Sequence, residues 1–271
     1  AGTDFIQARS GATLDISAYT RGVDLLGLEY ITDNNGSETI TGTDQADEIR
    51  IVEDASTDVF YGNDGDDTFR FSGDINRNDR IYGGQGTDQL LGSSGDDSLT
   101  LHTLDSIEFI DFGAGTDFMQ ARSGATLDIS SYTLGVDLLG LEYITDNNGS
   151  ETVIGTNQAD DIRIRDDAST DSFFGLGGDD VFTFSGSVNR NDRIDGGEGT
   201  DRIVGSAGND SLTLADFISI EIIDFGAGTD FMQSETNGTL DISAYTLGVD
   251  LLGLDYITDN IGSETITGTD Q

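Results

Sequence analysis

The sequence predicts an all-β chain whose short parallel strands stack as a β-roll, a rod-like β-solenoid with about 18–21 residues per coil. Two observations predict this class: a long internal repeat and, inside it, a short period that places one acidic and one apolar residue in every unit. A third observation is that helical periodicity is nowhere sustained. Short strands joined by turns are therefore the expected elements throughout.

The long repeat returns at a constant interval. The opening segment AGTDFIQARSGATLDISAYT recurs with few changes at Ala114 and again at Ala227. Both ends of the chain fall inside a copy, which suggests a slice of a longer repetitive chain. We expect one continuous solenoid made of two full copies and a partial third, residues 1–113, 114–226 and 227–271.

The short period predicts the strands. An acidic residue, a variable residue and an apolar residue recur in that order, mostly every 9 to 12 positions. This spacing is too short for helical repeats and fits one strand plus one turn, so two units make a coil. In stacked strands the apolar residues point inward; in the first copy they include Ile40, Ile49, Phe60, Phe69, Ile81, Leu90 and Leu99.

The composition excludes several functions. Twelve basic residues stand against 52 acidic ones, which gives a formal net charge of −40. Such a surface repels nucleic acid and an anionic membrane face. Every basic residue is Arg, so Schiff-base chemistry is excluded, and the absence of Cys excludes disulfides and thiolate ligands. No signal peptide or membrane-spanning apolar run is evident.

Two isolated features do not make the chain an enzyme or an ice-binding protein. His102 is the single histidine, and its counterpart in the second copy is Ala215, which argues against a catalytic triad. Thr39, Thr41 and Thr43 alternate as an ice-binding ladder does, but strand propensity is the simpler explanation. We therefore expect no catalytic site.

The turns carry the chemistry. Gly83-Gly84-Gln85-Gly86-Thr87-Asp88-Gln89-Leu90-Leu91 matches the nonapeptide G-G-x-G-x-D-x-U-x at every fixed position. Glycines let the backbone curl so that carbonyl oxygens point into the turn, and the sixth-position Asp adds a carboxylate. Two such turns stacked on one side of a solenoid form a set of oxygen ligands that suits Ca²⁺ better than Mg²⁺. The nonapeptide from Gly196 in the second copy also fits the motif, and near-matches begin at Gly62, Gly92, Gly175 and Gly205.

These nonapeptides, together with the stretches LEYITDNNGSETITGTDQADEI and SIEFIDFGAGTD, resemble the repeats-in-toxin (RTX) family of hemolysin-type calcium-binding β-rolls. The resemblance implies a right-handed parallel β-roll, Ca²⁺ between successive turns on the same side, and type I secretion of an unfolded chain. It places Asp67 and Asp88 on one edge and Asp97 and Asp117 on the other. Their counterparts in the second copy are Asp180, Asp201, Asp210 and Asp230.

The candidate metal-site residues lie in these turns, and most occupy their first, third, fifth or sixth positions. The complete set is Gly62, Asp64, Asp66, Asp67, Gly83, Gln85, Thr87, Asp88, Gly92, Asp96, Asp97, Gly113, Gly115, Asp117, Gly175, Gly177, Asp179, Asp180, Gly196, Glu198, Asp201, Gly205, Asn209, Asp210 and Asp230.

Other turns depart from the motif. GTDQADEIR and EDASTDVFY lack its glycines, which argues against ion binding there, and Glu38 and Glu108 replace Asp with a longer side chain. Arg77 and its counterpart Arg190 occupy a fourth position, where we expect the guanidinium to stand in for a calcium ion. The region from Thr13 to Thr32 has no glycine-rich turn and is expected to be ion-free.

The sequence thus favours a non-catalytic, extracellular, calcium-binding structural repeat. It would form the shaft of a bacterial adhesin, a surface-layer protein or a biofilm-matrix fibre, secreted to the medium or the cell surface. The alternative is the calcium-binding C-terminal module of a type I secreted protease, lipase or epimerase. A third possibility is carbohydrate or ice binding through a flat strand face. The expected partners are calcium ions and other copies of the chain, associated into fibres by calcium bridges or end to end.

Overall fold

The computed structural model confirms the predicted fold class. The chain is an all-β parallel β-solenoid of about 11 turns. The structure describes residues 2–75, 79–100, 103–165, 167, 169–184, 186–188, 192–213, 216–234, 237–259 and 262–269. Across these ranges the regular elements are short strands, and none of them includes a helix long and apolar enough to cross a membrane.

The strands form two compact units whose bounds do not coincide with the sequence copies. Unit 1 comprises Ala1–Met119 and Leu134–Glu142, and unit 2 comprises Gln120–Thr133 and Tyr143–Gln271. Within each unit a strand pairs in parallel with a strand one coil later in the chain. The pairing follows from connections that always return to the same side of the coil.

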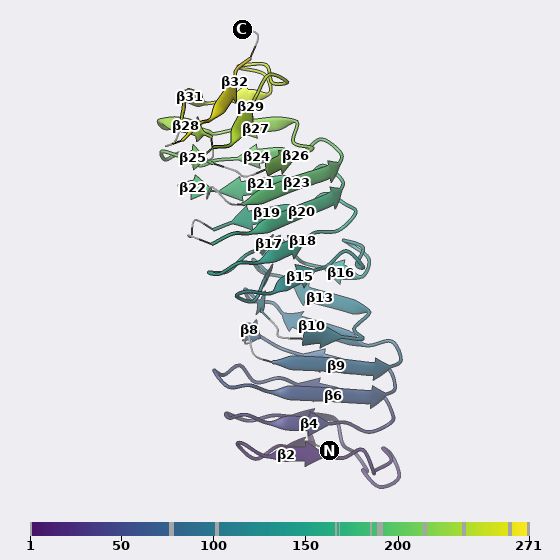
Figure 1. The fold of residues 1–271 in the computed structure, drawn as a ribbon. Helices are drawn as coiled ribbons and strands as arrows, with labels where there is room; N and C mark the ends of the chain where they lie inside the picture. The colour runs from purple at the N-terminus through teal and green to yellow at the C-terminus, as the bar shows by residue number, and fades with distance from the viewer. Residues whose placement is uncertain are drawn as a thin grey trace. The chain divides into compact units, whose positions relative to one another are not determined.

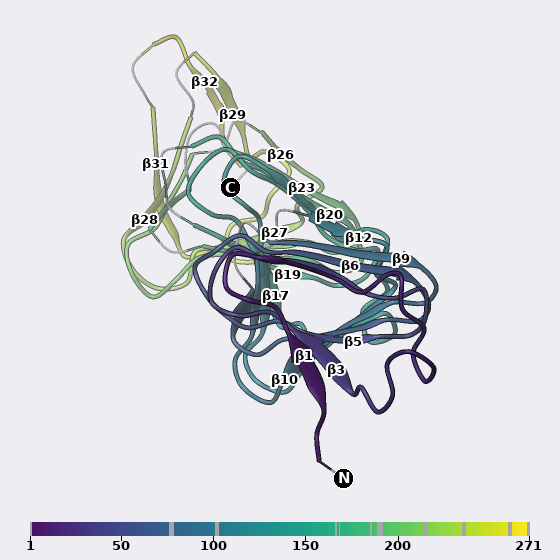
Figure 2. The same cartoon turned by 90° about the horizontal axis from the view of Figure 1, so that it is seen from below.

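Unit 1 contains three sides (Figures 1 and 2). In Figure 2 the strands β1, β3, β5 and β10 of the first side lie apart from β6 and β9 of the second. The first side has the order β1 (Phe5–Gln7), β3 (Tyr30–Thr32), β5 (Glu48–Arg50), β7 (Thr68–Arg70), β10 (Gln89–Ser93), β13 (Phe109–Gly113) and β16 (Leu138–Leu139). The second has β2 (Thr13–Asp15), β4 (Thr39–Thr41), β6 (Val59–Asp64), β9 (Arg80–Gln85) and β12 (Thr103–Asp105). The third has β8 (Asp74–Ile75), β11 (Ser98–Leu99) and β14 (Phe118–Gln120).

Unit 2 repeats this plan. One side has β17 (Tyr143–Thr145), β19 (Asp161–Ile164), β21 (Val181–Phe184), β24 (Arg202–Val204), β27 (Ile222–Asp224) and β30 (Leu251–Leu252). The next has β15 (Thr126–Asp128), β18 (Thr152–Ile154), β20 (Ser172–Gly177), β23 (Arg193–Glu198) and β26 (Asp216–Ile218). The remaining strands are β22 (Ser187–Val188), β25 (Ser211–Leu212), β28 (Asp230–Gln233) and β31 (Leu254–Thr258), and the pair β29 (Thr239–Asp241) and β32 (Thr265–Thr267).

The core is one column of apolar side chains per side. The central residue of each strand stacks on the central residue one coil away, as in the series Ile49, Phe69 and Leu90. Each of these three residues is fully buried, and its neighbours along the strand face outward. The inward positions expected from the short period are therefore confirmed, because residues that alternate along a strand point to opposite faces.

The coils differ in length. Ile31, Ile49, Phe69, Leu90 and Ile110 occupy the same place in consecutive coils, and their numbers show that these coils are nearly equal in length. The coils before and after them are longer, because Ile6 pairs with Ile31 and Ile110 with Leu138. The expected coil length thus applies to this run of coils, and the longer coils contain loops without glycine-rich nonapeptides.

The sequence period is not a whole number of coils. Five successive pairings lead from Ile6 to Ile110. Met119, the counterpart of Ile6 in the second copy, lies further along the chain than Ile110 and pairs with Leu99 on the third side of unit 1. The same sequence segment therefore lies on different sides of the coil in successive copies.

The buried columns predict which substitutions unfold the chain. Phe69→Ala should lower the free energy of unfolding by about 3–5 kcal/mol, because it leaves a cavity in a fully buried column. Tyr19→Ala, at a half-exposed residue, is the control and should cost less than about 1 kcal/mol. Denaturant unfolding at one fixed calcium concentration measures both, and equal losses would contradict the assignment of the core.

Candidate metal centres in the acidic turns

The sixth positions of successive turns form a ladder of carboxylates held by backbone amides. The N–H of Asp67 donates to Asp88 Oδ1 at 2.7 Å, and the N–H of Asp97 donates to Asp117 Oδ1 at 2.6 Å. The same bond occurs in unit 2, from Asp180 to Asp201 and from Asp210 to Asp230. The structure thus brings together each pair that the resemblance places on one edge. The cause is the strand register, which stacks each of these residues on its equivalent one coil later.

A longer acidic side chain continues the ladder where Asp is replaced. Glu108 accepts the N–H of Asp88 through Oε2 at 2.8 Å, and Glu142 accepts the N–H of Asp117 at 2.6 Å. The extra methylene group of Glu lets its carboxylate reach the backbone N–H of the preceding coil. Glu108 therefore preserves the contact that an Asp makes elsewhere.

Among the described residues, six aspartates of the ladder keep one oxygen without a hydrogen-bond partner. All six side chains are fully buried, so water does not replace the missing donor. A buried charge without a partner is strongly unfavourable. These oxygens therefore require a proton or a cation; they are Oδ2 of Asp67, Asp88, Asp117, Asp180, Asp201 and Asp230.

The first-position glycines leave a space lined by oxygens. A Cβ atom on Gly62 would overlap Asp67 Oδ2 and would lie 2.5 Å from the carbonyl oxygen of Gly83, one coil later. A Cβ on Gly83 would likewise overlap Asp88 Oδ2 and the carbonyl oxygen of Ser106. Gly175 and Gly196 have the same surroundings in unit 2. Glycine is required at these positions because a side chain would fill this space.

The second residue of each turn decides whether the carboxylate has a local donor. In the turns of Asp97 and Asp47 this residue is Ser93 or Thr43, and its N–H donates to Oδ2 at 2.6 Å. Ser206 and Thr156 do the same in unit 2. Where Oδ2 is unpartnered, the second residue has a left-handed backbone; these residues are Asn63, Gly84, Gly113, Leu176, Gly197 and Gly226.

Leu176 shows that the left-handed conformation is maintained at a cost. Its φ is +77°, a region that a large side chain rarely adopts. Such strain persists only where the surroundings enforce it. The turn of Asp180 therefore keeps the ion-ready geometry without the glycine that the motif has at its second position.

Burial controls the electrostatics of the ladder. It raises the pKa of Asp67 to about 7, with neighbouring carboxylates adding to the rise, and it raises the pKa of Asp180 to about 7 for the same reasons. Burial also raises the pKa of Asp88, Asp117 and Asp201. A bound cation would favour the charged form of each carboxylate and so would displace protons from these turns.

The donor set fits Ca²⁺. Unpartnered carboxylate oxygens of Asp67 and Asp88 face spaces that also contain the carbonyl oxygens of Gly83 and Ser106. An all-oxygen set of carboxylates and carbonyls is the coordination that Ca²⁺ prefers. When bound, the ion would supply the positive charge that these carboxylates lack.

The remaining candidates do not contribute an unpartnered buried oxygen. Some accept a backbone N–H of the next turn, and others are glycines or exposed side chains. The fifth-position side chains Asp66, Asp96, Asp179 and Asn209 each accept a backbone N–H from the turn one coil later, that of Thr87, Thr116, Thr200 and Thr229. Asp64, Gln85 and Glu198 are exposed at strand ends. A Cβ on Gly92 or Gly205 would approach the sixth-position Asp of its own turn, and one on Gly113 or Gly115 would overlap a carbonyl of the preceding coil, whereas Gly177 has ordinary spacing.

An arginine that the sequence motif does not single out pairs with a ladder carboxylate. Nη1 of Arg21 lies 2.8 Å from Oδ1 of the buried Asp47. The counterpart of Arg21 in the second copy is Leu134. The second copy therefore has no arginine at this position. Arg77, Arg190 and His102 lie outside the described residues.

Two acidic clusters were not selected from the sequence. One contains Asp33, Glu38 and Asp58, and the other contains Asp146, Glu151, Asp167 and Asp171. In each cluster the carboxylate oxygens lie within 4.8 Å of one another. Burial raises the pKa of Asp33 to about 8 and that of Asp146 to about 7. The signal available in the sequence was an Asp at the first position of the turn, where the motif has Gly, in both copies.

The glycine cradle can be tested with a matched pair of substitutions. Gly62→Ala should weaken Ca²⁺ binding by about tenfold or more, because the new methyl group fills the oxygen-lined space. Gly95→Ala is the control, since its Cβ would meet only Ser93 Oγ, at 3.6 Å. Neither glycine has a positive φ. Calorimetric titration with Ca²⁺ measures both variants, and equal affinities would exclude the cradle.

The raised pKa values predict the pH dependence of the calcium-depleted protein. Asp67 and Asp180 have folded-state pKa values of about 7, above the value of about 4 for an unfolded chain. Between these pH values the folded chain binds more protons, so its stability falls as the pH rises. Calcium-depleted protein should show more β signal in circular dichroism at pH 5 than at pH 8. The opposite order would contradict the buried, unpaired state of these carboxylates.

Comparison with known families agrees with this geometry. The family model of the RTX calcium-binding nonapeptide repeat (4 copies) matches residues 54–77, 76–99 and 188–214. The matched segments contain the turns of Asp67, Asp88, Asp97, Asp201 and Asp210. No curated protein matches the chain. The chain therefore carries RTX calcium-binding nonapeptide repeats, which bind Ca²⁺, within a parallel β-solenoid.

Proposed function

We propose that the chain is a non-catalytic, calcium-stabilised structural repeat that works outside the cell, as the shaft of a bacterial adhesin, a surface-layer protein or a matrix fibre. The observation that carries the proposal is the set of six buried oxygens without a partner on the sixth-position Asp residues of the described turns. These oxygens are spread along the coils of both units rather than gathered in one pocket. Ions distributed in this way stabilise a scaffold.

Charge explains why the ions would act as a switch. At a net charge of −40 the ion-free chain repels itself, and stacked carboxylates add to the repulsion. Extracellular calcium-binding modules have dissociation constants of about 10⁻⁴–10⁻³ M. The chain would therefore stay unfolded at the low calcium concentration inside a cell and fold after secretion. Binding and folding are then one process.

The repeat geometry supports a structural role over a flat binding face. A regular array for ice or a polysaccharide needs the same residues on the same side in every copy. Here one sequence copy is not a whole number of coils, so Phe5–Gln7 and Phe118–Gln120 belong to different sides of unit 1. Each sequence copy is the module by which the protein is lengthened. Bundling with other copies would need calcium bridges, because the surfaces repel.

A calcium titration tests this function. Far-UV circular dichroism of the whole chain, from chelator to about 10 mM Ca²⁺, should show a cooperative gain of β signal, because the ions neutralise the ladder. Mg²⁺ is the control and should give little gain, because it requires a regular octahedral set of ligands and gives up its bound water reluctantly. A full β signal in chelator would mean that the turns with local Ser and Thr donors hold the solenoid without calcium.

A further inference from the structure

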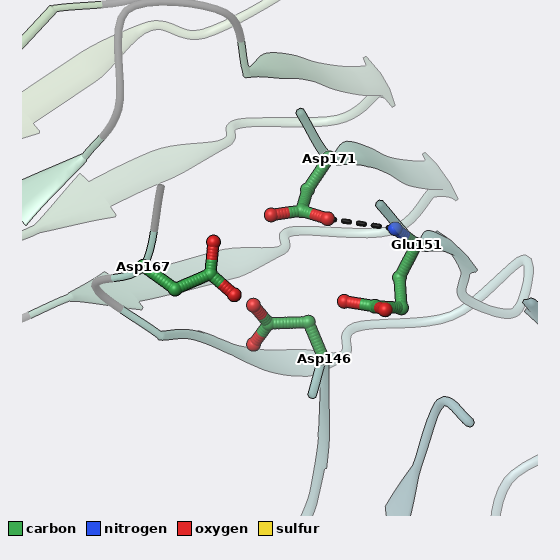
Figure 3. Close-up of side chains that lie close together, drawn as sticks. All are labelled: Asp146, Glu151, Asp167 and Asp171. Atoms are coloured by element: carbon green, nitrogen blue, oxygen red, sulfur yellow. Dashed lines mark hydrogen bonds between the residues drawn. The ribbon is translucent and has the colours of Figure 1, made fainter. Parts of the chain in front are cut away.

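Four carboxylates from two consecutive turns of unit 2 converge on one point, outside the glycine-rich motif. Asp146 follows β17 and Glu151 precedes β18, while Asp167 and Asp171 lie between β19 and β20. Parallel pairing of β17 with β19 and of β18 with β20 stacks the two turns. Each residue contributes an oxygen to a group whose members lie within 4.8 Å of one another (Figure 3).

Backbone amides hold all four side chains in place. Each carboxylate has one oxygen that accepts an N–H, so its orientation does not depend on the other acids. The donors are Arg165 to Asp146 at 2.9 Å, Gly124 to Glu151 at 2.7 Å, Ser169 to Asp167 at 2.6 Å and Glu151 to Asp171 at 2.7 Å. In the folded chain the backbone therefore fixes the geometry of the cluster.

A second observation points to a ligand. Asp146 is fully buried, and its Oδ2 has no hydrogen-bond partner. Figure 3 shows its carboxylate turned toward Asp167. No ion pair between an arginine and any of the four acids occurs in the part of the chain that the structure describes. Four formal negative charges thus meet at a buried position without a counter-charge.

The arrangement recurs in unit 1, in the first sequence copy. Asp33, Glu38 and Asp58 occupy the equivalent positions and form the same kind of group. Asp33 and Glu38 are buried, and Asp33 Oδ2 and Glu38 Oε2 have no partner. Buried like charges that meet without a counter-charge are costly, so both copies place the same demand for a cation at this turn.

We propose that each cluster is a cation site of a second kind, in which carboxylates bind Ca²⁺ without the glycine-turn carbonyls. It has Asp at the first position of its turn, where the nonapeptide has Gly, and Glu at the sixth. The turns that end at Glu38 and Asp58, and their counterparts in the second copy, thus take part in ion binding although they lack the glycine at the motif's first position. The larger negative charge makes this site the tightest in the chain, so it fills first. The proposal rests on the calcium-dependent folding proposed above.

The test removes the unpartnered charge while keeping its shape. The double variant Asp33→Asn/Asp146→Asn of the whole chain should lose the tightest class of Ca²⁺ binding in calorimetric titration, one ion per cluster. The control is Asp15→Asn/Asp128→Asn, at exposed positions of the two copies whose carboxylates bond only to a neighbouring Ser. It should bind as the unaltered chain does.

Two comparisons keep this proposal separate from the proposed function. If the unaltered chain gains no β signal with Ca²⁺, the proposed function fails. If it folds with Ca²⁺ but the double variant binds the same number of ions with the same affinity, the clusters are not cation sites. Should the double variant fail to fold at about 10 mM Ca²⁺, the single variants Asp33→Asn and Asp146→Asn decide. Each should lose one tight ion, and no loss in either overturns the proposal.

Discussion

The repulsion between stacked carboxylates is the constraint on which the rest of this structure depends. Parallel strands in register place equivalent residues of successive coils directly above one another. In this chain the register sets Asp67 above Asp88 and Asp180 above Asp201, with a backbone N–H of one bound to the carboxylate of the next. These hydrogen bonds fix the stack, but they satisfy only one of the two oxygens of each carboxylate. Everything else in the turns serves to satisfy the second oxygen.

The chain meets this demand in two ways. Turns with Ser or Thr at the second position supply their own N–H, as Ser93 does for Asp97. At Asp47 the Thr43 N–H takes this oxygen, and Arg21 adds a guanidinium at the other oxygen, Oδ1. Turns with a left-handed second residue leave this oxygen without a donor, beside carbonyl oxygens that could join it in binding a cation, as at Asp67 and Gly62. Backbone donors within the turns and bound ions would thus together neutralise the stacked carboxylates, which explains how so acidic a chain can fold.

Much of this could be predicted from the sequence, and the exceptions have physical causes. The inward columns and the pairing of Asp97 with Asp117 follow from a period that every coil repeats. The two classes of turn were not predicted, because replacing Gly by Ser at one position changes which way a single N–H points. The Asp146 cluster was missed because its members come from two turns that lack the motif, and their meeting depends on the pairing of β17 with β19.

The sequence by itself determined the all-β class, the parallel stacking and the chemical type of the ligand, because apolar and acidic residues recur at spacings that only short stacked strands accommodate. The tertiary structure decided which carboxylates lack a donor, where four of them meet, and on which side of the coil each copy begins. These properties depend on the exact lengths of individual coils. The short coil from Ile31 to Ile49 and the longer one from Ile110 to Leu138 look alike as strings of short units, yet their difference in length sets which residues become neighbours one coil away.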